Sequence, residues 1–190
     1  YLNGEPIGTF YLLQWTGIDD DGLSTFFDRD KDGIITDKDR MAMGTALAKV
    51  LYSFYGGASW KGFDLNINLN GTAGNKVYDN TANSFFYKAK IAKNVNTTSA
   101  ANEFPNESIN NPARVSSRYL KKASYLRLNN ATLGYQFNPG QLGIGKWVNG
   151  LRLSVTGQNL FVITDYDGFD PEVNIDRQID NVFSYGVDYL

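Results

Sequence analysis

The sequence of 190 residues contains no cysteine and no histidine. These absences exclude disulfide frameworks, zinc sites built from Cys or His, cysteine nucleophiles and catalytic triads that use histidine. Sites in which oxygen ligands bind a hard cation remain open. A glycosidase needs only two carboxylates, but the acidic residues here cluster in turns and in one Asp-rich loop. We therefore expect no enzymatic activity.

The chain also lacks a strong charge and a long apolar run. Its net charge is −2, and Lys and Arg form no basic stripe, so we expect no nucleic-acid partner. No apolar run reaches the roughly 18 residues of a membrane helix, but membrane β-strands need only about 9–11 residues of alternating character. Tyr and Phe, 12 of each, favour β-structure over disorder.

Several segments alternate between apolar and polar residues with period two, which is the strand pattern. The clearest are residues 63–70, 131–137 and 151–158, and less regular candidates cover 8–18 and 50–60. Leu126 and Leu128 are out of phase with the residues after them, which predicts a bulge near Asn129 and Asn130. Gly56-Gly57 is expected to form the turn into the strand that begins at Phe63.

The polar faces of these strands carry Asn, Gln, Thr, Ser and Arg, with few Lys or Glu. This composition suits a barrel with a wet interior and a lipid-facing exterior. A soluble β-sandwich alternates in the same way, and alternation alone favours the sandwich. The polar segment 75–117 is too long for a sandwich turn, whereas barrels of this class carry long loops on one rim.

The stretch DRDKDGIITDKD, residues 28–39, has the residue order of an EF-hand calcium loop. In that order Asp28, Asp30 and Asp32 supply carboxylates, Gly33 allows the sharp turn, and Ile34 supplies its carbonyl. Asp39 stands at the last ligand position, where the longer Glu is usual. We predict a Ca²⁺ site formed by Asp28, Asp30, Asp32, Ile34 and Asp39.

An acidic surface turn is the alternative for this loop, because Asp and Gly are common turn formers. The upstream sequence reads as a strand and turn rather than a helix, and only one copy of the loop is present. We therefore expect a structural calcium site rather than a sensor.

Three longer motifs occur around this loop. GTFYLLQWTGID precedes it, VSSRYLKKASYLRLNNATLGYQF follows the long middle segment, and LRLSVTGQNLFVITDYDGFDPEVN comes next. Their content and order resemble the C-terminal part of the SusC/RagA family of TonB-dependent outer-membrane transporters. The resemblance covers nearly the whole chain, residues 1–190.

The resemblance implies an all-β fold of antiparallel strands with long loops, forming a segment of a 22-stranded transmembrane β-barrel. It implies uptake of oligosaccharides or peptides across a Bacteroidetes outer membrane, with a SusD-like surface lipoprotein as partner and energy from a TonB complex. The chain starts at Tyr1 without a plug-like domain or TonB box and stops before a terminal aromatic strand. We expect it to be part of a barrel wall with its loops.

Individual residues then receive structural interpretations. Gly134 and Gly157 suit close approaches within barrel strands. Interior-facing candidates are Asn66, Asn68, Arg152 and Gln158, and girdle candidates are Tyr125, Tyr135, Phe137, Phe161 and Tyr166. The stretch YDGFDPEVN forms a second cation site or, as we prefer, a rim turn fixed by Pro171.

A second reading of the sequence is a calcium-stabilised soluble β-module that binds carbohydrate. Trp15, Trp60 and Trp147 would stack on sugars in such a module, whereas in a barrel they would pack or anchor at the membrane interface.

Overall fold

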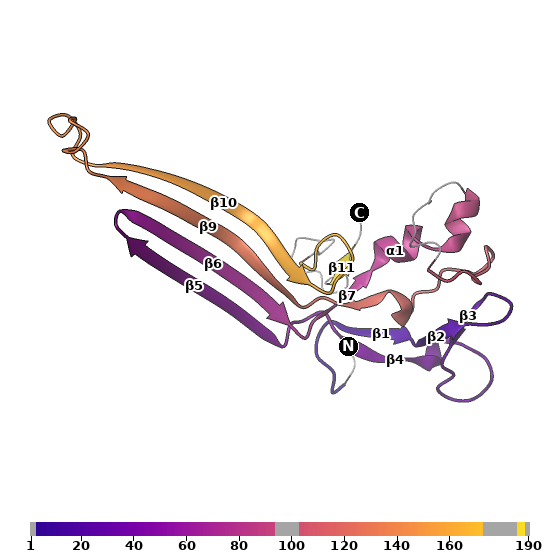
Figure 1. Ribbon diagram of the computed structural model, residues 1–190. Helices are drawn as coiled ribbons and strands as arrows, with labels where there is room; N and C mark the ends of the chain where they lie inside the picture. Colours follow the sequence, from indigo (N-terminus) through magenta and orange to yellow (C-terminus); the bar gives the residue numbers. More distant parts are fainter. Residues whose placement is uncertain (1–2, 94–102, 173–185, 189–190) are drawn as a thin grey trace. The chain divides into compact units, whose positions relative to one another are not determined.

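The computed structural model describes residues 3–93, 103–172 and 186–188, and most of its regular structure is β-strand (Figure 1). The chain divides into two compact units. Unit 1 comprises Tyr1–Ala48, Gly74–Ala123 and Tyr166–Leu190, and unit 2 comprises Lys49–Ala73 and Ser124–Asp165. The sequence prediction of an all-β chain with antiparallel strands and long connections is confirmed.

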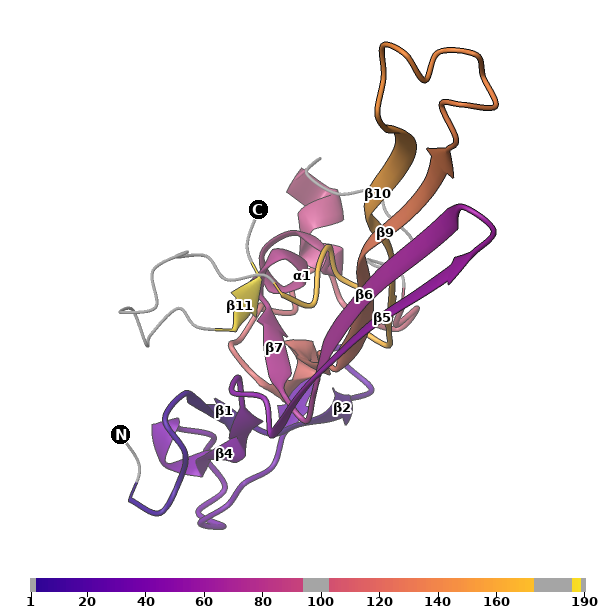
Figure 2. The same cartoon turned by 90° about the vertical axis from the view of Figure 1, so that its left-hand side faces the viewer.

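Unit 2 is one antiparallel sheet of four long strands. Its strands are β5 (Val50–Trp60), β6 (Phe63–Ala73), β9 (Tyr125–Phe137) and β10 (Leu151–Thr164), and their order is β10-β9-β6-β5 (Figure 2). Every neighbouring pair in this sheet is antiparallel. All four points at which the chain passes between the units therefore fall at the same end of the strands.

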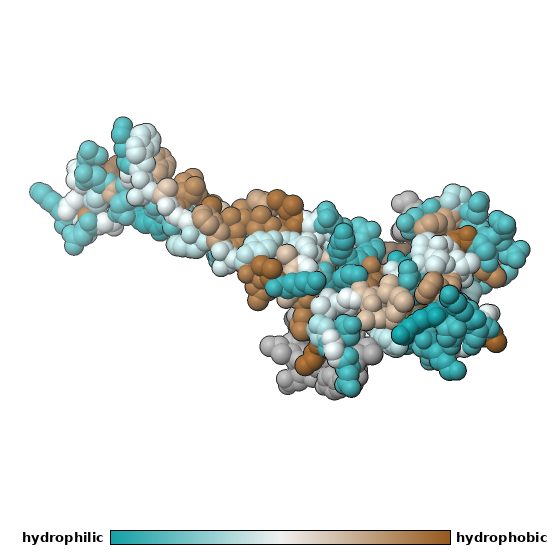
Figure 3. Space-filling view, turned by 90° about the horizontal axis from the view of Figure 1, so that it is seen from below, coloured by the Kyte–Doolittle hydropathy of each residue, from teal (hydrophilic) through white to brown (hydrophobic). Residues whose placement is uncertain are grey.

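The register of the sheet separates apolar from polar side chains. Leu65 lies opposite Ala58 on one side and Leu133 on the other, while Asn66 lies opposite Gly57 and Thr132. The apolar face carries Tyr52, Phe54, Trp60, Phe63, Leu65, Ile67, Leu69, Leu126, Leu128, Leu133, Tyr135, Phe137, Leu151, Leu153, Val155, Phe161 and Ile163. Many of these side chains are exposed, including Trp60 at 70% and Val155 at 72%. Apolar residues accordingly gather along one side of the sheet (Figure 3).

The bulge predicted near Asn129 and Asn130 is confirmed. On β6, Asn68 pairs with Asn130 but the next residue, Leu69, pairs with Leu128, so Asn129 is the extra residue on β9. The register between β9 and β10 shifts at the same place. A bulge reverses the alternation locally, which returns Leu126 and Leu128 to the apolar face.

The turn predicted at Gly56-Gly57 is wrong, because β5 continues through both glycines to Trp60. The turn into β6 is at Lys61 and Gly62, where both residues have positive φ, 47° and 89°. Positive φ at both central residues is the requirement of the tightest hairpin turns. The two earlier glycines instead make room for neighbours, since a Cβ on Gly57 would lie 2.7 Å from the Asn66 side chain.

The close approach predicted at Gly134 has a specific cause. Arg152 on β10 forms a bidentate ion pair with Asp64 on β6, at 3.1 Å and 2.6 Å, and the pair passes over Gly134 on the strand between them. A Cβ on Gly134 would lie 2.5 Å from the guanidinium and 2.6 Å from the carboxylate. The close approach predicted at Gly157 is also confirmed, because a Cβ there would lie 2.6 Å from the Leu160 side chain.

Unit 1 contains short strands and little helix. Its strands are β1 (Thr9–Leu13), β2 (Trp15–Ile18), β3 (Ser24–Phe26), β4 (Arg40–Thr45), β7 (Lys76–Asp79), β8 (Leu120–Lys122) and β11 (Val187–Asp188). Its helices are α1 (Asn80–Phe85) and the 3₁₀ turns η1 (Asp37–Asp39), η2 (Lys88–Lys93) and η4 (Ser117–Tyr119). β1 pairs with β4, β2 with β3, and β7 lies between β8 and β11.

The apolar core of unit 1 is small. Leu12, Tyr78, Ala82 and Tyr119 form its main cluster, and Val77, Ala123 and Tyr166 form a second. Tyr125 and Tyr166, which the sequence suggested as membrane-girdle residues, are both buried. The Tyr166 hydroxyl donates a hydrogen bond to Asp188 at 2.5 Å, so the girdle interpretation is wrong for these two tyrosines.

We predict that Gly134→Ala destabilises the sheet by about 1–3 kcal/mol, because the added methyl group must displace the Asp64–Arg152 ion pair. Thermal unfolding of the purified protein measures the effect. Gly150→Ala is the matched control, since the nearest atom to a Cβ there is 3.7 Å away. Equal unfolding temperatures for the two variants would contradict the crowding at Gly134.

Candidate functional site

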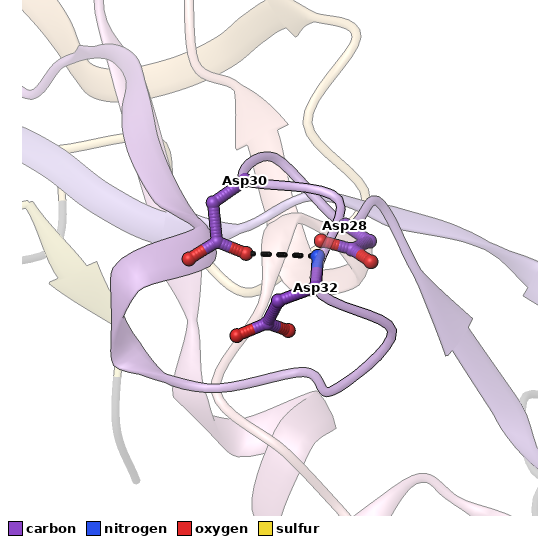
Figure 4. A group of neighbouring side chains, drawn as sticks. All are labelled: Asp28, Asp30 and Asp32. Atoms are coloured by element: carbon purple, nitrogen blue, oxygen red, sulfur yellow. Dashed lines mark hydrogen bonds between the residues drawn. The ribbon is translucent and has the colours of Figure 1, made fainter.

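The Asp-rich loop between β3 and η1 brings three of the predicted ligands together. Asp28, Asp30 and Asp32 each have a carboxylate oxygen within 4.8 Å of the others (Figure 4). Asp28 is half-buried, while Asp30 and Asp32 are exposed. Among the residues that the structure describes, this is the only group of three acidic side chains with the spacing of a metal site.

The loop backbone explains why these carboxylates converge. Lys31 and Gly33 have positive φ values of 60° and 82°, so the chain turns tightly on both sides of the third aspartate, Asp32. Asp28 accepts hydrogen bonds from the backbone N–H groups of Lys31 and Gly33, at 2.7 Å and 2.8 Å. Asp32 accepts another from Ile34 at 2.8 Å. The loop is therefore folded around its own aspartates.

Asp39, the residue at the last predicted ligand position, lies outside this group of three. It is fully buried, and its two oxygens accept hydrogen bonds from the backbone N–H groups of Arg29 at 2.9 Å and Thr36 at 2.7 Å. Thr36 and Asp39 also form a reciprocal cap at the start of η1. Asp39 thus ties the two ends of the loop together.

The hydrogen bond from Thr36 is the main reason why the pKa of Asp39 is lowered, against the opposing effect of burial. Because the pKa of Asp39 is lower in the folded than in the unfolded protein, its carboxylate stabilises the fold. That stabilisation is fully present at pH values above the ordinary pKa of 3.8. That contribution is lost only as the pH falls through the lower folded pKa. The closure by Asp39 is therefore intact at neutral pH.

As the sequence predicted, the loop is not flanked by EF-hand helices. The strand β3 ends at Phe26 before the loop, and β4 begins at Arg40 directly after η1. The side chain of Ile34 is 66% exposed, whereas Ile35 is half-buried and lines a small cleft with Leu23 and Phe26.

The four residues predicted to face a barrel interior share one face of the sheet. Asn66, Asn68, Arg152 and Gln158 all lie on the polar face. This face also carries the apolar Leu51 and Val162, and the polar residues Ser53, Tyr55, Ser59, Asp64, Asn70, Thr72, Tyr125, Arg127, Asn130, Thr132, Gln136, Ser154 and Thr156. Thr132 and Thr156 share a hydrogen bond across the strands at 2.9 Å. The surface is therefore rich in hydrogen-bonding groups and nearly free of unpaired charge within the described strands.

Sequence reasoning missed a set of buried ion pairs in unit 1. Arg118 pairs with Glu107 through both guanidinium nitrogens, at 2.7 Å and 2.8 Å, and Asn111 donates to the same carboxylate at 2.6 Å. Burial alone would raise the pKa of Glu107, but the hydrogen bonds from Arg118 and Asn111 outweigh it and the pKa is lowered. The partners have no regular spacing, so no periodicity identifies them.

The turn interpretation of YDGFDPEVN agrees with the described part of that stretch. Asp170 accepts a hydrogen bond from the backbone N–H of Glu172 at 2.9 Å, across Pro171. Asp167 pairs instead with Lys121 at 2.6 Å. The residues from 173 onward in this stretch lie outside the described residues.

None of the helices in the described ranges is long and apolar enough to cross a membrane.

Comparison with known proteins supplies the family. No family model matches the sequence. The chain is 31% identical over 210 residues to TonB-dependent receptor P3 of Formosa agariphila, and it is 30% identical over 182 residues to TonB-dependent receptor SusC of Bacteroides thetaiotaomicron. These alignments include 98% and 90% of the chain but only 21% and 17% of the two receptors.

Solved structures agree on the fold. The chain superposes on a structure described as the RagAB peptide transporter with a TM-score of 0.72 at 22% identity, over 86% of this chain and 20% of the solved one. A structure of the RagAB peptide importer in an open state gives a TM-score of 0.68. The resemblance drawn from the sequence motifs is confirmed, and the chain is a portion of a SusC-like TonB-dependent receptor.

Proposed function

We propose that this chain forms part of the wall of an outer-membrane nutrient importer, with the four-stranded sheet of unit 2 crossing the bilayer. The exposed apolar face of that sheet is the observation that supports the proposal most strongly. Soluble monomers rarely expose contiguous apolar patches larger than a few hundred Å². Lipid covers such a face at no cost, because hydrocarbon is as apolar as the side chains.

The strand lengths fit this role. β5 and β6 have 11 residues each, β9 has 13 and β10 has 14. A tilted strand needs about 9–11 residues to cross the hydrocarbon layer. Aromatic rings also gather near the turn that joins β5 to β6, where Tyr135 packs against Phe63 at 4.5 Å and Phe137 at 4.7 Å. Aromatic girdles mark the interfaces of membrane barrels.

The connections favour one orientation. At one end of the sheet β5 and β6 are joined by two residues, and β9 and β10 by residues 138–150. At the other end the chain passes into the long segments of unit 1. Barrels of this class carry their short turns on the periplasmic rim and their long loops outside the cell. We infer on this basis that the end of the sheet with the two-residue β5–β6 turn faces the periplasm.

We further propose that the complete receptor takes up oligosaccharides or peptides, draws energy from a TonB complex and works with a SusD-like surface lipoprotein. The relatives described as TonB-dependent receptors support the energy source, and the solved RagAB peptide transporter supports a peptide substrate and a two-component assembly. No catalytic role is proposed.

The alternative, a soluble calcium-stabilised module that binds carbohydrate, meets two difficulties. Of the three candidate tryptophans, Trp15 donates a hydrogen bond to Ser24 and packs against Phe104, which leaves it poorly placed to stack on a sugar, whereas Trp60 and Trp147 are exposed. The apolar face would also be left in water. The alternative would gain support if the chain, produced without detergent, gave a monodisperse monomer that bound glycans.

The two faces of β10 provide a direct test of the membrane role. We predict that Val155→Arg prevents stable assembly of the receptor in the outer membrane, because Arg on a lipid-facing strand costs up to about 2–4 kcal/mol near the bilayer centre. Thr156→Arg, one residue away on the polar face, is the matched control and is expected to assemble. The measurement is the amount of heat-modifiable receptor in isolated outer membranes. Equal assembly of both variants would contradict lipid contact.

We also propose that the Asp-rich loop binds one Ca²⁺ as a structural ion. Asp28, Asp30 and Asp32 would supply carboxylates and Ile34 its carbonyl, while Asp39 would hold the loop closed and complete the site only if its hydrogen bonds rearrange. The convergence of three carboxylates and the positive φ values of Lys31 and Gly33 support this proposal. A bound cation would offset the mutual repulsion of the carboxylates.

The calcium proposal predicts that Ca²⁺ slows cleavage of the wild-type protein after Lys31 and Lys38 by the serine protease Lys-C, which needs no metal ion, relative to buffer with EDTA. In the double variant Asp28→Ala, Asp32→Ala we expect no such protection, because two of the three clustered carboxylates are removed. The double variant Asp20→Ala, Asp21→Ala removes two exposed carboxylates nearby and should keep the protection. If Ca²⁺ protects all three proteins equally, the loop is not the site.

A further inference from the structure

Unit 1 contains a cavity of about 510 Å³, lined in part by residues at the end of β7 and in α1. Its walls come from four separate parts of the chain: residues 79–86, Glu103, residues 118–121 and the turn at residues 167–169. Sites for small ligands commonly have volumes of about 300–1,000 Å³. The cavity is therefore large enough for a side chain with its adjoining backbone.

The two cationic side chains that the described residues contribute to the cavity wall, Arg118 and Lys121, are already neutralised. The Lys121 ammonium lies 2.6 Å from the Asp167 carboxylate and 3.1 Å from that of Asp79. Burial would lower the pKa of Lys121, but its bonds to Asp167 and Asp79 raise it, so the lysine stays charged. Arg118 is held by both oxygens of Glu107. Neither cation is available to attract an anionic ligand.

The remaining charge of the cavity is negative. Among the described residues, three carboxylates line it, those of Asp79, Glu103 and Asp167, against the two cations. Glu103 is exposed and belongs to no ion pair within the described residues. Asp167 is also exposed, and only one of its two carboxylate oxygens contacts Lys121. Because Glu107 already neutralises Arg118, the excess of negative charge resides at these two exposed carboxylates.

Aromatic rings complete the lining. Phe86, Tyr119 and Phe169 contribute to the wall, and Phe169 is 65% exposed. Aromatic faces attract ammonium and guanidinium groups as well as the apolar stems that carry them. Arg118 already uses this chemistry at the edge of the cavity, where its guanidinium lies 5.3 Å from the Tyr119 ring and 5.0 Å from that of Phe104.

We propose that this cavity binds an organic cation of the lysine or arginine type, presented on a short peptide, with its charged group at Glu103 and Asp167 and its alkyl stem against the aromatic rings. A neutral sugar would leave the excess negative charge unused, and an anion would be repelled by it. The proposal goes beyond the transport role, because binding at equilibrium requires neither a membrane nor energy input.

The test is isothermal titration of the full receptor in detergent at low salt, with tripeptides whose ends are blocked. Acetyl-Gly-Lys-Gly-amide is expected to bind at least about tenfold more tightly than the Gln and Glu analogues, since one charge-assisted hydrogen bond supplies about that factor. Butylamine serves as a separate arm, and weaker binding of butylamine than of the Lys peptide is expected if the peptide backbone contributes.

Variants locate the binding. Glu103→Gln and Asp167→Asn are each expected to weaken the Lys peptide about tenfold. Asp165→Asn, which removes an exposed carboxylate outside the cavity lining, should leave it unchanged. Because Asp167 also pairs with Lys121, Glu103→Gln provides the variant that breaks no described ion pair.

Two results would overturn the proposal. The first is equal affinity of wild type for the Lys and Gln peptides, and the second is unchanged Lys-peptide affinity in Glu103→Gln. Either result would leave the membrane assignment of unit 2 untouched, because that assignment rests on the sheet and is tested by assembly.

Discussion

The register of the four-stranded sheet is the constraint on which the rest of the structure depends. Side chains alternate with period two along a strand, so a slip of one residue would move every apolar side chain to the opposite face. Four strands hold the same register, and the bulge at Asn129 preserves it where the sequence of β9 changes phase. The sheet therefore presents a continuous apolar face that needs a cover and a polar face that needs water. A lipid bilayer around a wet interior satisfies both needs at once.

Unit 1 is stabilised differently, because its apolar core is small. Its irregular segments are joined by ion pairs, such as Arg118 with Glu107, where both side chains are buried, and Lys121 with Asp79, where the lysine is half-buried. Loss of one partner of a buried ion pair typically costs about 3–5 kcal/mol, because the other charge is left without compensation. The Asp-rich loop is also held by a buried polar side chain, since Asp39 closes it by accepting hydrogen bonds from the backbone. Long loops held in this way can present a defined surface, including a charged cavity, without a large core.

The sequence predicted those features that depend on local pattern. Alternation located β6, β9 and β10, the phase change at Leu128 located the bulge, and Gly134 and Gly157 were correctly expected at close approaches. The turn at Gly56-Gly57 was misplaced, because glycine inside a strand and glycine in a turn differ only in what surrounds them. Tyr125 and Tyr166 were misassigned to a girdle, because a buried tyrosine and a membrane-interface tyrosine also differ only in what surrounds them. In the Asp-rich loop the spacing gave the three converging aspartates, but the engagement of Asp39 with the backbone required the folded structure. The cavity is lined by four segments that are far apart in sequence, and no local sequence pattern predicts that they lie together.

The most direct test of the account is the environment of single side chains along β10. The chain contains no cysteine, so residues 151–156 can be replaced one at a time by cysteine and carry a nitroxide label in the receptor reconstituted into lipid bilayers. Electron paramagnetic resonance then compares collision with oxygen, which concentrates in lipid, and with a water-soluble nickel complex. The account predicts strict alternation, with labels at Leu151, Leu153 and Val155 favouring oxygen and those at Arg152, Ser154 and Thr156 favouring nickel. Equal access of the nickel complex to all six positions would contradict a membrane-spanning sheet.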